Sequence, residues 1–179
     1  MVRQGVRKAI DALITVDLVI AGLALMAMLV HVVLDVILRE VHVPFSGTLE
    51  IVSFWYMVAL VFLAIPVAQA HGHHIKVELF TVAISPRVQK MIDIVVLLAC
   101  AALLVVFVWV SVEEALRQTS RHAMVEAGTG TIAVWPTRWL VPLSMATTCL
   151  ICVMQACDLV RSLITGIEPP THARKSLDV

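Results

Sequence analysis

The stretch from Pro44 to Glu78 reads PFSGTLE, then IVSFWYMVALVFLAIPVAQA, then HGHHIKVE. Its central part, residues 51–70, is a run of 20 residues that contains no Asp, Glu, Lys or Arg. As an α-helix rising about 1.5 Å per residue, this run would extend roughly 30 Å, which is the thickness of the hydrocarbon core of a bilayer. The stretch therefore predicts a membrane-spanning helix, with Glu50 at its entrance and a group of histidines at its exit.

The composition of the whole chain is typical of a membrane protein. Of its 179 residues, 60% are hydrophobic and 15% are charged, and the mean hydropathy is +0.97. Soluble domains carry about a quarter charged residues. The formal net charge is zero, so nothing indicates a nucleic-acid partner. We therefore expect an integral membrane protein.

Apolar runs long enough to cross a bilayer occur at four places along the chain. The first follows the basic segment MVRQGVRK and is too long for the apolar region of a cleaved signal peptide, so we expect it to be retained. We predict an all-α fold with one transmembrane domain over residues 1–166 and a polar, disordered tail over residues 167–179. The expected transmembrane helices lie near residues 13–37, 50–70, 91–113 and 139–162.

The distribution of basic residues predicts how these helices are oriented. Nine Lys and Arg residues fall in the N-terminal segment, the loop after the second span and the C-terminal segment, whereas four fall in the other two loops. We expect the chain to lie in the cytoplasmic membrane. Because Lys and Arg concentrate on the cytoplasmic side of membrane proteins, we expect both termini in the cytoplasm. Trp135 and Trp139 flank a short polar segment and are predicted to anchor the last span at the membrane interface.

The loop before the second span has two interpretations. In the first, Arg39 and Glu50 form an ion pair across the loop at the membrane surface. In the second, Glu50 lies in the first turn of the span because the helix dipole favours an acid there, with Ser46 or Thr48 as the N-cap. Pro44 is a turn residue in either case.

The segment after the second span combines histidines with an amphipathic pattern. Three histidines within four residues are too crowded to converge on one ion from a regular helix, so a polar turn is favoured over a metal site. Beyond them, apolar residues interleave with charged ones, which predicts a short interfacial helix that ends at Ser85. The residues concerned are His71, His73, His74, Ile75, Lys76, Val77, Glu78, Leu79 and Phe80.

Polar residues in the first span and cysteines in the last two are interpreted as packing residues. Asp17 and Asp35 are 18 residues apart, about 27 Å along a helix, so they cannot form one site. A proton path through these residues and His31 is the alternative to interface and packing roles. Cys149 and Cys152 form a CxxC pair, but apolar surroundings favour buried thiols over a redox or metal function.

In order along the chain, these features resemble the small permease subunit of TRAP transporters (DctQ-like), which are tripartite ATP-independent periplasmic systems of bacteria and archaea. The resemblance depends on an Arg-x4-Pro loop, an acid at the start of the second span and a Gly-x-His-Ile-x-Val-acid motif at its end. The last span also begins like that of the family, with IAVWPTRWLVPL. The matching positions are Arg39, Pro44, Glu50, Gly72, His74, Ile75, Val77 and Glu78.

The resemblance implies a subunit that is neither an enzyme nor the carrier of a cofactor. It would contact membrane lipids and brace a large permease subunit that contains the substrate and sodium sites. A periplasmic substrate-binding protein would deliver an organic acid to that subunit. The residues themselves agree in one respect, because no span has a charge at its centre, and transporter binding sites commonly lie at such depths.

Two other functions remain open at this point. A membrane anchor of a redox complex would need haem or quinone ligands at matching depths, and the predicted topology places no two histidines at one depth. An autonomous small transporter would need a polar path, for which His31, Ser53 and Gln69 are the main candidates.

Overall fold

The fold is described from a computed structural model, in which residues 2–43, 45–71, 85–128 and 130–165 are placed. The long helices are α1 (Val2–Glu40), α3 (Met57–Ala70), α4 (Pro86–Ser120) and α5 (Leu140–Thr165). A short helix α2 (Thr48–Ile51) and a π-helical turn η1 (Val52–Tyr56) lead directly into α3. A hairpin of β1 (Met124–Ala127) and β2 (Gly130–Ala133), followed by the 3-10 turn η3 (Pro136–Trp139), joins α4 to α5.

Within the described part of the chain, four helical stretches are long and apolar enough to cross a membrane. They are residues 10–40, 48–70, 87–120 and 136–165, so the prediction of four spans in an all-α membrane protein is confirmed. The second span ends at residue 70 as predicted, and the other ends lie further out. The shift is largest for α1 and α4, because both continue as helix into their charged flanks. At 39 residues, α1 is about 58 Å long, well above the thickness of the hydrocarbon core.

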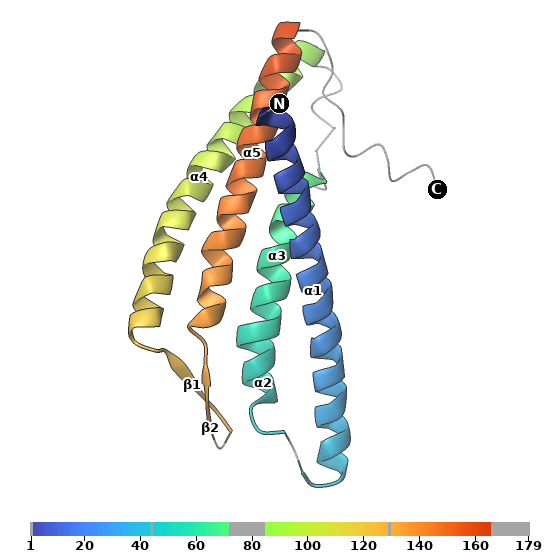
Figure 1. The fold of residues 1–179 in the computed structure, drawn as a ribbon, viewed down its shortest axis with the longest axis vertical. Coiled ribbons are helices and arrows are strands. Elements are labelled where there is room, and N and C mark those ends of the chain that lie inside the picture. The colour runs from blue at the N-terminus through green and yellow to red at the C-terminus, as the bar shows by residue number, and fades with distance from the viewer. Residues whose placement is uncertain (1, 44, 72–84, 129, 166–179) are drawn as a thin grey trace, which may run out of the picture.

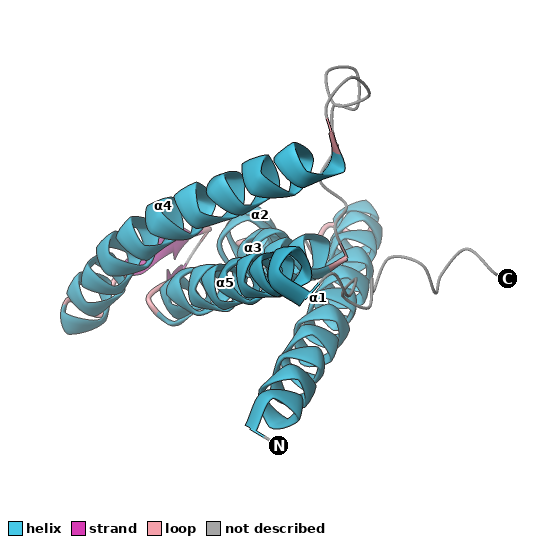
Figure 2. Ribbon diagram, turned by 90° about the horizontal axis from the view of Figure 1, so that it is seen from above, coloured by secondary structure: helices cyan, strands magenta, loops and turns pink. Residues whose placement is uncertain are grey.

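The four long helices pack in the order α1, α3, α5, α4 rather than in chain order. Figure 1 shows α3 between α1 and α5, and Figure 2 shows from above that α1 and α4 lie on the outside of the arrangement. The start of α1 and the end of α5 lie at one end of the molecule, and the loop before α2 and the hairpin lie at the other. This arrangement leaves the two outer helices with one main neighbour each.

The outer helices are attached through narrow stripes of side chains. From residue 10 to residue 40, every side chain of α1 that is shielded from the surface follows a spacing of alternately four and three residues. The stripe, which we call the α1 seam, consists of Ile10, Ile14, Asp17, Ala21, Ala24, Met28, His31, Asp35 and Leu38. This is the heptad spacing of left-handed helix pairs. On α4 the same spacing relates nine shielded residues: Lys90, Ile94, Leu97, Ala101, Leu104, Val108, Ser111, Ala115 and Gln118. The shielded face of α4 is wider near its two ends, where it also includes Gln89, Asp93, Val112, Glu114 and Thr119.

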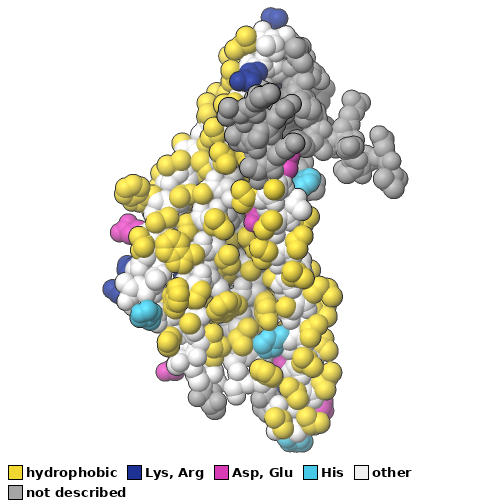
Figure 3. Space-filling view, in the orientation of Figure 1, with side chains coloured by type: hydrophobic (Ala, Val, Ile, Leu, Met, Phe, Trp, Pro, Cys, Tyr) yellow, Lys and Arg dark blue, Asp and Glu magenta, His cyan; other side chains and the backbone are white. Residues whose placement is uncertain are grey.

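The rest of the outer helices is exposed and apolar. Leu23 on α1 and Trp109 on α4, for example, are 65% and 74% exposed. In Figure 3, hydrophobic side chains are spread over the described part of the face, with few charged side chains among them. Exposed apolar surface of this extent is typical of a protein surrounded by lipid or by other membrane proteins.

The inner pair, α3 and α5, is joined by polar contacts at the position of a proline. Pro66 has no backbone N–H, so the carbonyl of Phe62 loses the hydrogen bond it would receive in a regular helix. The hydroxyl of Ser144 on α5 donates to that carbonyl instead. Nearby, the side-chain amide of Gln69 donates to Gln155 Oε1 at 2.9 Å, and Gln155 donates back to the Gln69 carbonyl at 3.0 Å. The freed backbone group is therefore satisfied by a neighbouring helix, as the bilayer interior requires.

Two features of the described chain, the hairpin and the N-cap of α2, were not predicted correctly. The hairpin was not anticipated, because its four-residue strands are short. The N-cap of α2 is Gly47 rather than Ser46 or Thr48, and it makes no side-chain cap. The predicted interfacial helix over residues 75–85 and the tail over residues 167–179 lie almost entirely outside the described residues.

Candidate functional site

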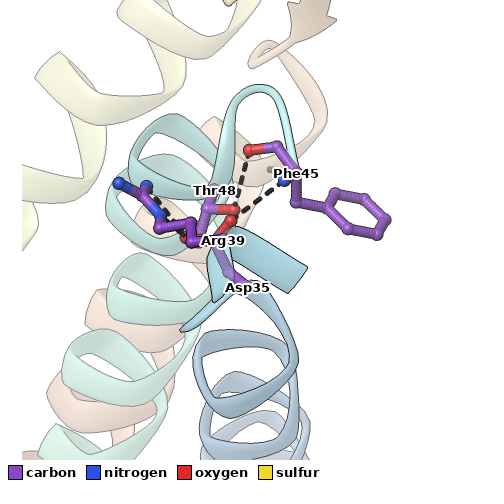
Figure 4. A network of polar contacts seen from close by, with 4 residues as sticks. All are labelled: Asp35, Arg39, Phe45 and Thr48. Atoms are coloured by element: carbon purple, nitrogen blue, oxygen red, sulfur yellow. Dashed lines mark hydrogen bonds and ion pairs between the residues drawn. The ribbon is translucent and has the colours of Figure 1, made fainter. Parts of the chain in front are cut away.

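The candidate site is the loop between α1 and α2, which is held by the carboxylate of Asp35 (Figure 4). Oδ2 of Asp35 accepts a hydrogen bond from Arg39 Nε at 3.0 Å and lies 2.9 Å from Arg39 Nη2. Oδ1 accepts from the backbone N–H of Phe45 at 3.1 Å. The hydroxyl of Thr48 in turn donates to the Phe45 carbonyl at 3.3 Å. One buried carboxylate therefore joins the last turns of α1 to the loop that enters α2.

The partner of Arg39 differs from the one that the sequence indicated. Arg39 pairs with Asp35, one turn earlier on α1, and not with Glu50. The reason is that α1 continues through Glu40, which places residues 35 and 39 on one face at a spacing of four. Glu50 lies in the first turn of α2, where the helix dipole favours an acid.

Asp35 and Arg39 differ in how deeply they are buried, and therefore in how much each contributes to the stability of the loop. The Asp35 side chain is 6% exposed, whereas that of Arg39 is 63% exposed. A carboxylate that leaves water needs its hydrogen bonds, and here both oxygens receive them. Asp35 is therefore the central residue of the site, and most of the Arg39 side chain is exposed.

An aromatic cluster lies next to this network on the α1 seam. The His31 ring meets the ring of Phe45 edge-on at 5.3 Å and the ring of Tyr56 at 5.9 Å. Its Nδ1 atom is 3.5 Å from the Tyr56 hydroxyl. Within the described part of the chain, the buried Nε2 atom has no hydrogen-bond partner. The cluster fixes the π-helical turn η1 against α1.

The hairpin interlocks with the loop through two glycines. Gly47 has φ of 90°, and a Cβ there would lie 2.8 Å from the Cβ of Ala127. Gly128 has φ of 58°, and a Cβ there would lie 2.7 Å from the Cβ of Ser46. Both positions therefore need glycine for space as well as for backbone conformation. We refer to the described loop residues 41–43 and 45–47 and the described hairpin residues 124–128 and 130–133 together as the cap.

One tryptophan attaches the cap to the helices, and two more make contacts beside it. The indole N–H of Trp55 donates to the carbonyl of Ala133 at 3.0 Å, and that of Trp139 donates to the hydroxyl of Thr119 at 3.0 Å. The ring of Trp135 meets that of His122 edge-on at 6.3 Å. Trp135 and Trp139 lie between the hairpin and α5, at the end of the bundle. Their role as anchors at the membrane interface stays a prediction.

Most of the motif at the exit of the second span cannot be placed. Gly72, His74, Ile75, Val77 and Glu78 lie outside the described residues, as does Pro44. Among the residues that the structure does describe, no group of three His, Cys, Asp or Glu side chains is arranged to hold a metal ion. Of the predicted motif residues, the described part of the chain therefore contains Arg39 and Glu50, which it does not pair with each other, and the other motif residues stay a prediction.

Fold and site together define a multi-pass helical membrane protein with a small, firmly packed cap at one end. The model of the family "Tripartite ATP-independent periplasmic transporters, DctQ component" matches residues 28–162. This match covers well over half of the chain, which therefore belongs to the DctQ family, the small permease component of TRAP transporters. Comparison with curated proteins and with solved structures found no match.

Proposed function

We propose that this chain is the membrane-bracing small subunit of a TRAP transporter that uses a sodium gradient to take up an organic acid. The observation that carries the proposal is the packing of α1 through a single seam, together with the largely exposed apolar surface of α4. A helix that uses one narrow stripe for its own fold keeps the rest of its apolar surface for lipid and for a partner's helices. The large permease subunit is the partner that this surface would contact.

The polar groups inside the spans support a static role. The buried hydroxyls of Ser144 and Ser162 bond to Phe62 and Lys90 on neighbouring helices. Those of Thr147 and Thr148 bond to carbonyls of their own helix. Groups used in this way hold helices together and do not line a path for a carboxylate. Substrate and sodium would therefore be bound by the large subunit.

The proposed orientation suggests a role for the cap in transport, as a contact surface for the substrate-binding protein. With both termini in the cytoplasm, the cap faces the periplasm, where a substrate-binding protein would arrive. The interlocked glycines and the Asp35 network hold the cap in one arrangement, and a surface arranged before binding loses less entropy on contact with a partner. The subunit would then contact the large permease subunit within the membrane and the substrate-binding protein at the periplasmic surface.

Uptake of radiolabelled substrate into proteoliposomes tests the proposal. With a sodium gradient and the binding protein present, we expect no uptake with this chain alone and uptake once the large subunit is added. Leaving out each component in turn identifies what each one contributes. Accumulation of substrate with this chain as the only membrane component would overturn the bracing function and favour an autonomous transporter.

A further inference from the structure

We draw no further inference here: the strongest candidate, the exposed apolar stripe of α5 formed by Leu143, Ala146, Leu150, Val153, Cys157, Val160 and Ile164, carries nothing because nothing in the structure shows whether lipid, a second copy of the chain or another protein covers it.

Discussion

At the scale of single residues, Asp35 and Arg39 form one ion pair but differ in what their loss should cost. Replacing Asp35 by Ala leaves the partly buried Phe45 N–H without its acceptor, and a donor left unsatisfied in a fully buried site would cost about 1–3 kcal/mol. Replacing Arg39 by Gln removes an exposed partner, and such pairs contribute about 0–1 kcal/mol. We expect Asp35→Ala to lower the free energy of unfolding in detergent more than Arg39→Gln does.

Glu50→Gln serves as the control for this comparison, because Glu50 lies at the same loop outside the Asp35 network. We expect it to cost about 0.3–1 kcal/mol, the loss of a favourable helix-dipole interaction, and therefore less than Asp35→Ala. If Arg39→Gln and Glu50→Gln lowered the free energy of unfolding more than Asp35→Ala, the result would contradict the Asp35 network and support an ion pair between Arg39 and Glu50.

The hydrogen bond from Ser144 to Phe62 should matter only as long as residue 66 is a proline. Ser144→Ala leaves the Phe62 carbonyl without a donor in an apolar environment, at a cost of about 1–2 kcal/mol. Pro66→Ala supplies a backbone N–H that can bond to the same carbonyl. We therefore expect Ser144→Ala to cost less in the Pro66→Ala background, as measured by a double-mutant cycle of unfolding free energies. Equal costs in both backgrounds would show that the carbonyl does not depend on Ser144.

At the scale of elements, the α1 seam predicts a sharp difference between two alanines of one helix. Ala21 lies on the seam and is 7% exposed, whereas Ala27 lies on the outer face. Enlarging a side chain in a packed contact typically costs about 1–3 kcal/mol. We expect Ala21→Leu to lower the thermal stability of the purified protein and Ala27→Leu to leave it nearly unchanged. A comparable loss in both variants would mean that the outer face of α1 is also packed in the isolated subunit.

The sequence allowed the spans to be predicted but not the helix ends. Charge-free runs mark where lipid surrounds the chain, and a helix continues past that point if its backbone can still form hydrogen bonds. This is why α1 begins at Val2 instead of near residue 13. The hairpin was missed because strands of four residues around Gly128 and Gly130 leave no clear alternation of polar and apolar residues.

The candidate site was predicted only in part, because the end of α1 was placed too early in the sequence. Arg39 was identified from its motif, but its partner was sought across the loop because the helix was expected to end before it. Two signals were present in the sequence. Asp35 and Arg39 have the helical spacing of four, and Asp17, His31 and Asp35 have the heptad spacings of 14 and four. Read together, they indicate one polar stripe along α1 that ends at the loop.

At the scale of the whole molecule, the orientation in the membrane is the property on which the proposed contacts with other proteins depend. The described structure places the cap at the opposite end from the start of α1 and the end of α5. If the basic residues determine the topology, the cap is periplasmic and the start of α4 is cytoplasmic. Two exposed residues, Thr131 in the hairpin and Arg87 in α4, report on these two ends.

We expect single cysteines at these two positions to react from opposite sides of the membrane. In a background in which the four native cysteines, Cys100, Cys149, Cys152 and Cys157, are replaced by alanine, a membrane-impermeant maleimide added to intact spheroplasts should label Thr131→Cys. Arg87→Cys should be labelled only after the membrane is permeabilised. The reverse pattern would place the cap in the cytoplasm, where a periplasmic binding protein cannot reach it. Labelling of both variants after permeabilisation provides the control for reactivity, so that a missing signal in intact spheroplasts reports the side of the membrane and not a buried thiol.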